Sequence, residues 1–212
     1  MQFHSIKRLI KPLIKSGHEW QYISLNGDSK GKPKLYFSGT QIIIIAICIF
    51  SIFWLKKGLD NSLMGYIISG FAISVSLFMS LLVNIFDKFE KTTFTTNGKD
   101  ADEIVRLDQK RNFFKKFISI TSYLVLMSIL IIVLCSFSYI YDTSRLIISL
   151  NNFCYKPAEI DYELTVKCIF VFFYRVALNY FLLDYLLLTL FIAGSSYEYY
   201  MSELNRTKIT RS

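Results

Sequence analysis

The chain has 212 residues, of which 53% are hydrophobic, and it carries a formal net charge of +8. This apolar fraction is too high for an ordinary soluble domain, and apolar runs of membrane length recur, so we predict an all-α, multi-pass protein of the bacterial inner membrane. The basic residues cluster beside the apolar runs, which is the pattern that sets membrane orientation, so membrane lipid is an expected partner and direct binding of nucleic acid is not expected.

The amino-terminal segment, residues 1–35, is predicted to begin with an amphipathic helix. Its apolar side chains share one helical arc: Phe3, Ile6, Ile10, Leu13 and Ile14. Lysines on the opposite flank favour a helix lying on the membrane surface, although the same face suits a partner or the protein's own bundle, and a frayed basic tail is the simplest alternative. Pro12 is expected to kink the helix. Residues 20–36 have the composition of two short extended segments joined by a glycine-containing turn.

Four apolar spans are predicted to form a four-transmembrane-helix bundle: residues 37–55, 62–86, 118–141 and 166–192. The shortest has 19 residues and reaches about 28 Å at ~1.5 Å per residue, close to the thickness of the hydrocarbon core. The short link after the first span predicts a tight helical hairpin with the second.

The second span carries small residues at three- and four-residue steps: Gly65, Ser69, Ala72, Ser76 and Ser80. A stripe of small side chains lets another helix approach closely, so we predict a helix-packing seam there, with a serine-rich face toward lipid as the alternative.

A charged segment, residues 87–117, separates the second and third spans. Asp100 and Glu103 resemble a capping box, so the third helix is predicted to begin near residue 101 and to continue into the bilayer, while the second runs on to about Phe94. The resulting cytosolic helical hairpin contains a basic and aromatic group that we predict to dock a partner: Phe113, Phe114, Lys115 and Lys116. A solvated helix end anchored at the interface is the alternative interpretation.

The fourth span places Arg175, Asn179 and Asp184 inside a membrane-length helix. Ionisable groups at that depth cost at least ~2.5 to 3.5 kcal/mol each, so they face a bundle interior, a subunit contact or a water-filled path. Nine positions place Arg175 and Asp184 about 180° apart, so one helix cannot pair them. Two separate hydrogen-bonded sites, or a pair between subunits, remain as alternatives. The helix is predicted to continue past the membrane to about Asn205.

Lys and Arg residues predict the orientation. The amino-terminal segment, the 87–117 segment and the tail hold 18 of the 24, and the opposite side holds five. Both termini are therefore expected in the cytoplasm. The predicted organisation is a cytosolic segment, a transmembrane hairpin, a charged cytosolic hairpin, a second transmembrane helix pair and a cytosolic tail, with boundaries 1–35, 36–86, 87–117, 118–192 and 193–212.

The sequence contains no phosphate-binding loop, dinucleotide fingerprint, nucleophile elbow or Cys/His cluster. We therefore expect no catalytic residues, no cofactor, no metal and no enzymatic activity. Two functional classes remain: a homo-oligomeric membrane subunit that senses a change in the envelope and holds a cytosolic protein partner, or a small homo-oligomeric channel with Arg175 or Asp184 as a filter or gate. The extended charged ends favour the first class.

The layout of four spans, cytoplasmic ends and a charged hairpin from FDKFEKTTF to RNFFKKF resembles the membrane subunit of the Kiwa bacterial anti-phage defence system. The resemblance implies a homo-oligomeric inner-membrane sensor of phage attack, coupled to a cytosolic DNA-binding partner subunit. It assigns no site residue, because no motif is matched.

Overall fold

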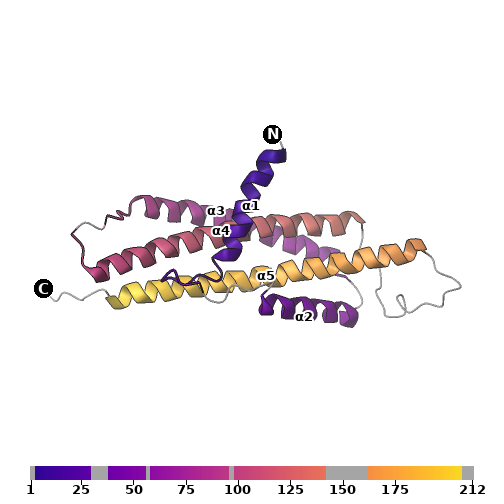
Figure 1. Ribbon diagram of the computed structural model, residues 1–212. Helices are drawn as coiled ribbons and strands as arrows, with labels where there is room; N and C mark the ends of the chain where they lie inside the picture. Colours follow the sequence, from indigo (N-terminus) through magenta and orange to yellow (C-terminus); the bar gives the residue numbers. More distant parts are fainter. Residues whose placement is uncertain (1–2, 30–37, 56–57, 96–97, 142–161, 207–212) are drawn as a thin grey trace. The chain divides into compact units, whose positions relative to one another are not determined.

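A computed structural model describes residues 3–29, 38–55, 58–95, 98–141 and 162–206 (Figure 1). These residues form five α-helices and no strand, which confirms the all-α prediction. The helices are α1 (Phe3–Glu19), α2 (Gly39–Leu55), α3 (Asn61–Glu90), α4 (Ala101–Tyr141) and α5 (Tyr162–Arg206). Of the extended segments expected after α1, the described part contains one antiparallel bridge, from Ile23 to Ser29. The second extended segment lies outside the described residues.

Three helices, α3, α4 and α5, are long and apolar enough to cross a membrane. The first predicted span, residues 37–55, corresponds to a shorter apolar helix, α2, whose 17 residues reach about 25 Å at ~1.5 Å per residue, so only three of the four predicted spans have the length of a membrane-crossing helix over the described residues. A capping box explains its start: the Ser38 amide donates to Gln41 Oε1 at 3.0 Å, and the Gln41 amide donates to Ser38 Oγ at 3.2 Å. This reciprocal pair begins the helix at Gly39, two residues later than predicted.

The charged segment after α3 is only partly as predicted. The third predicted helix begins at Ala101 and runs unbroken for 41 residues, so its extension beyond the apolar span is confirmed. The second ends at Glu90 and not near Phe94. Thr92 closes that end, because its hydroxyl donates to the Lys88 carbonyl at 2.8 Å and its amide donates to the Phe89 carbonyl at 3.0 Å. The fourth predicted helix continues to Arg206, one residue beyond the prediction.

The chain divides into two compact units. Unit 1 comprises Met1–Lys32, Ser76–Leu126 and Leu187–Ser212, and unit 2 comprises Pro33–Val75 and Met127–Leu186. The helices α3, α4 and α5 each continue from one unit into the other.

In unit 2, α5 contacts each of the other three helices. Phe172 of α5 lies 5.6 Å from Phe53 of α2 between ring centroids, and Figure 1 shows these helices side by side. Tyr185 packs edge-on against Phe71 of α3 at 4.7 Å. The hydroxyl of Tyr174 donates a hydrogen bond to a carbonyl of α4. The fourth predicted span is therefore the central helix of this unit.

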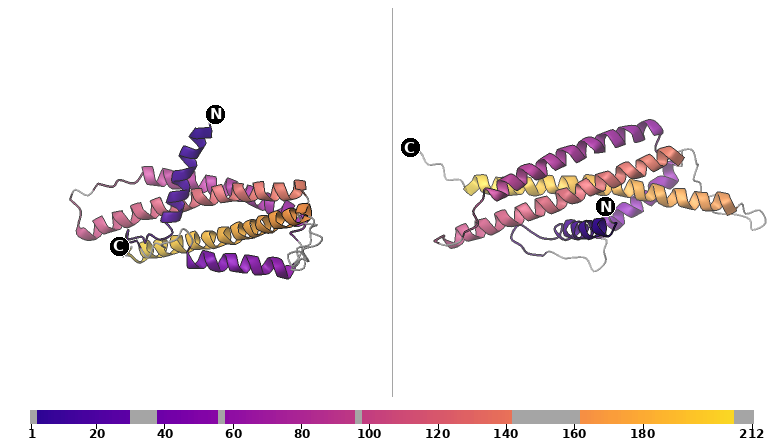
Figure 2. Two further views of the ribbon diagram at one scale, coloured as in Figure 1. Left: turned by 45° about the vertical axis from the view of Figure 1, so that its right-hand side comes forward. Right: turned by 90° about the horizontal axis from the view of Figure 1, so that it is seen from above.

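In unit 1, α1 crosses α4 (Figure 2). The hydroxyls of Ser16 and Ser119 lie 2.7 Å apart, and Gly17 is buried against Tyr123. Pro12 lies inside the helix, which continues past it. The carboxyl end of α1 thus packs on the protein's own bundle, one of the arrangements that its apolar face allowed. That the remainder of α1 lies on the membrane surface stays a prediction.

Candidate functional site

The polar residues of α5 predicted to lie within the membrane are enclosed in unit 2. Arg175 is 6% exposed and Asp184 is 5% exposed, while Asn179 is half-buried. Both charged residues make interactions inside the structure. Their burial agrees with the cost of turning such groups toward lipid. Pairing between subunits stays a prediction.

The small-residue stripe of α3 is exposed on this chain, from Gly65 through Ser69, Ala72 and Ser76 to Ser80. A Cβ built on Gly65 meets no atom within 4 Å. Over the described residues, therefore, nothing packs closely on the start of the stripe. A seam there requires another chain, and it stays a prediction.

Of the four residues predicted to dock a partner, only Lys115 is exposed. Phe113 is 2% exposed and stacks on Tyr199 of α5, with centroids 4.1 Å apart and planes 8° apart. Lys116 is buried, donates to the Ile23 carbonyl at 3.3 Å and lies 4.6 Å from the centre of the Phe191 ring. These side chains hold α4 to α5 and to the amino-terminal segment. Three of the four side chains are therefore buried within this chain, and the docking of a partner by this group stays a prediction.

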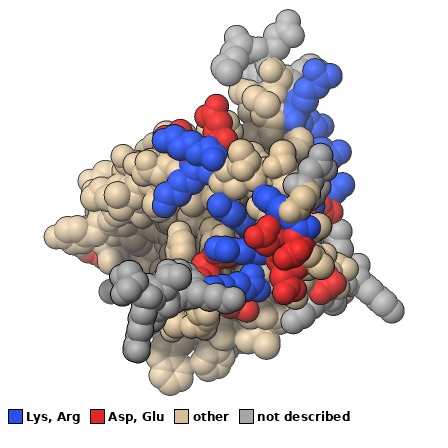
Figure 3. All heavy atoms as spheres, turned by 90° about the vertical axis from the view of Figure 1, so that its left-hand side faces the viewer, with Lys and Arg blue, Asp and Glu red and all other residues tan. Residues whose placement is uncertain are grey.

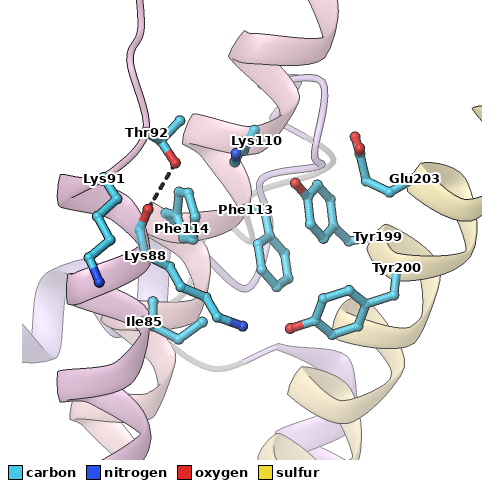
Figure 4. A pocket seen from close by; sticks show the side chains of 10 residues that line it. All are labelled: Ile85, Lys88, Lys91, Thr92, Lys110, Phe113, Phe114, Tyr199, Tyr200 and Glu203. Carbon is cyan, nitrogen blue, oxygen red and sulfur yellow. Dashed lines mark hydrogen bonds between the residues drawn. The ribbon is translucent and has the colours of Figure 1, made fainter. Parts of the chain in front are cut away.

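A pocket opens beside the buried phenylalanines, between α3, α4 and α5 in unit 1 (Figure 4). It has a volume of about 370 Å³. Its walls come from Ile85, Lys88, Lys91 and Thr92 near the end of α3, from Lys110, Phe113 and Phe114 of α4, and from Tyr199, Tyr200 and Glu203 of α5.

The floor of the pocket is a small aromatic cluster. Phe113 contacts Tyr199 face to face and Tyr200 edge-on, with 6.0 Å between the centroids of the latter pair. Phe114 meets Phe89 edge-on at 5.5 Å. Such pairs add about 0.5 to 1.5 kcal/mol each beyond their area burial, so the floor is expected to be rigid.

The charged residues of the pocket are mostly basic. Lys88, Lys91 and Lys110 line it, and none of them makes an ion pair with another described residue. In Figure 4 the ammonium group of Lys88 points into the pocket toward the hydroxyl of Tyr200. The single acidic residue, Glu203, accepts hydrogen bonds from both Nε and Nη2 of Arg106, so its charge is compensated.

The surroundings shift three ionisation equilibria. The hydrogen bond and charge of Glu203 raise the pKa of Arg106. Burial raises the pKa of Tyr199 to about 12, and the nearby carboxylate of Glu203 adds to the rise. Burial lowers the pKa of Lys116, which Glu198 opposes. Beyond these residues, basic and acidic side chains gather on the face at the end of this unit (Figure 3).

Sequence reasoning missed the contact between α4 and the segment that follows α1. Asn112 donates to the Leu25 carbonyl at 3.1 Å, and Gln109 donates to Asn26 Oδ1 at 2.8 Å. With Lys116, these donors recur at three- and four-residue steps on one helical face. That stripe of long polar donors is the signal by which the contact could have been found.

No family model matches the sequence, and it shows no significant match to a curated protein or to a solved structure. Over the part of the chain that the structure describes, no three His, Cys, Asp or Glu side chains gather as they would around a metal ion.

Proposed function

We propose that the protein is a non-enzymatic subunit of the bacterial inner membrane that assembles with copies of itself and holds a cytosolic protein partner through unit 1. In this arrangement α2 serves as a fourth membrane-crossing helix, and both termini lie in the cytoplasm. The Kiwa-like layout makes anti-phage defence the setting that we propose, with the bundle sensing a change in the envelope.

The length of two helices carries this proposal. At ~1.5 Å per residue, the 41 residues of α4 and the 45 residues of α5 reach about 62 and 68 Å. The hydrocarbon core of a bilayer is only about 30 Å thick. The excess of both helices lies in unit 1, which has its own apolar core around Ile85, Phe113, Phe114 and Tyr199. A bundle that only crosses the membrane has no need of such a structured extension.

The channel alternative rested on Arg175 and Asp184 lining a path. In unit 2 the helices of one chain already enclose both side chains. Charges enclosed in this way are not available to a lumen formed between chains, which supports the anchoring role over the pore.

Two variants test the partner-holding role. Lys115→Glu reverses an exposed charge of unit 1, whereas Lys167→Glu makes the same change on an exposed lysine of unit 2. A soluble protein that co-purifies with the wild-type chain at a fixed ratio should be lost with the first variant and kept with the second.

Two results would contradict the proposal. One is equal retention of that soluble protein by both variants. The other is ion flux through liposomes that contain only the purified chain, which would favour the pore. Labelling from outside intact cells should reach Gly58→Cys and not Gly98→Cys, and the reverse pattern would overturn the orientation.

A further inference from the structure

The basic pocket lies at the depth of lipid headgroups when α3, α4 and α5 cross a membrane. Counted from the ends of the apolar spans at ~1.5 Å per residue, Lys88 is about 3 Å beyond the hydrocarbon, Phe113 about 8 Å and Tyr199 about 10 Å. The polar region of one leaflet is roughly 5 to 8 Å thick. The pocket therefore spans the boundary between headgroups and cytosol.

The walls of the pocket fit a ligand with an anionic end and an apolar end. Three lysines contribute positive charge, and the Arg106–Glu203 pair is neutral. Ile85 and the aromatic floor supply apolar contact beside them. The volume of about 370 Å³ is near the lower end of the roughly 300 to 1,000 Å³ usual for ligand sites, which suits a headgroup and the start of an acyl chain.

We propose that this pocket binds the phosphate group of an anionic phospholipid on Lys88, whose ammonium group points into it, with Lys91 and Lys110 adding positive charge at the walls and the adjoining apolar part of the lipid against Ile85. Basic pockets between membrane helices recognise anionic headgroups in this manner, because a phosphate carries the charge that several ammonium groups favour and the acyl chain remains in the bilayer. A soluble compound with a phosphate beside an apolar group shares this chemistry. Binding requires the helices to be in the membrane or in detergent, but no partner protein.

Titration of the full chain in a neutral detergent tests the site. The probes are dihexanoyl phosphatidylglycerol, dihexanoyl phosphatidylcholine with the same acyl chains and a zwitterionic headgroup, and glycerol phosphate without acyl chains. The anionic lipid is expected to bind at least about tenfold more tightly than the zwitterionic one. The triple variant Lys88→Gln, Lys91→Gln, Lys110→Gln is expected to lose that preference.

A second triple variant controls for the general loss of positive charge. Lys7, Lys11 and Lys15 are exposed on α1 of the same unit and lie outside the pocket. Their replacement by glutamine should leave the preference for phosphatidylglycerol unchanged.

Three results would overturn the assignment. Equal binding of the two lipids would show that charge is not recognised, and equal losses in the two triple variants would show that the pocket is not the site. Binding of glycerol phosphate as tight as that of phosphatidylglycerol would overturn the lipid as ligand and assign the lysines to a soluble phosphate compound.

Discussion

Gly17 of α1 packs directly against Tyr123 of α4, and alanine at this position is expected to detach the amino-terminal helix. A Cβ built on Gly17 lies 2.5 Å from Cβ and 2.8 Å from Cγ of Tyr123. Because the Tyr123 Cβ is fixed to the α4 backbone, a rotamer change cannot remove the clash, and the two helices must separate. Overpacking of this kind costs about 1 to 3 kcal/mol.

Gly194 provides a matched control for the same substitution. It lies inside α5, and a Cβ built on it meets nothing within 4 Å. Alanine raises helix propensity by up to ~1 kcal/mol at either glycine, so the difference between the two variants reports the contact with Tyr123. That difference of about 1 to 3 kcal/mol is a change of roughly 5- to 150-fold in the ratio of docked to undocked α1.

Disulfide formation between Ser16→Cys and Ser119→Cys measures docking directly, because the two native hydroxyls lie 2.7 Å apart. Adding Gly17→Ala to this pair should slow the cross-link, whereas adding Gly194→Ala should not. Equal cross-linking rates in the two backgrounds would refute the close approach of Gly17 to α4.

Three further predictions address other parts of the molecule. When the spectrophotometric titration curve of Tyr199→Phe is subtracted from that of the wild type, the difference should show a step near pH 12, because burial raises the pKa of Tyr199 from 10.0 to about 12. A step near pH 10 would contradict the burial of this side chain. Since the folded-state pKa is the higher one, the stability that Tyr199 contributes is complete below about pH 10 and is lost as the pH rises toward about 12. Arg175→Met and Asp184→Leu should each lower the thermal stability of the protein, and in a double-mutant cycle their two losses of free energy should add to within about 0.5 kcal/mol. A double variant that regains much of the lost stability would instead indicate a pair between subunits. Ser69→Leu and Ser76→Leu should lower the oligomer yield on size-exclusion chromatography if the stripe meets another chain, and an unchanged yield would place it against lipid.

The long helices could be predicted because their signals are local. Hydropathy over tens of residues identifies α3, α4 and α5, and the absence of breakers after Asp100 predicts that α4 begins well before its apolar part. The errors at the ends of α2 and α3 also have local causes. Gln41 completes a capping box with Ser38, and Thr92 closes the end of α3, so each helix is shorter than hydropathy and charge suggested.

The pocket could be predicted only in part. A basic and aromatic group near residue 113 is evident in the sequence, but RNFFKKF places rings and charges on every side of a helix, so no periodicity selects the buried face. Tyr199 lies on another helix and Ile23 precedes the first apolar span, and these distant residues decide that Phe113 and Lys116 face inward while Lys115 faces out.

The sequence alone determines which segments are helical and how far two of them exceed the thickness of a bilayer, because hydropathy depends on composition and spacing. It also determines that Arg175 and Asp184 belong inside the protein, because exposing a charge to lipid is costly. Tertiary packing alone decides which face of each helix is buried. That choice depends on side chains that meet across distant parts of the chain, where Phe113 stacks on Tyr199 and Glu203 is held by Arg106, leaving the lysines to line the pocket.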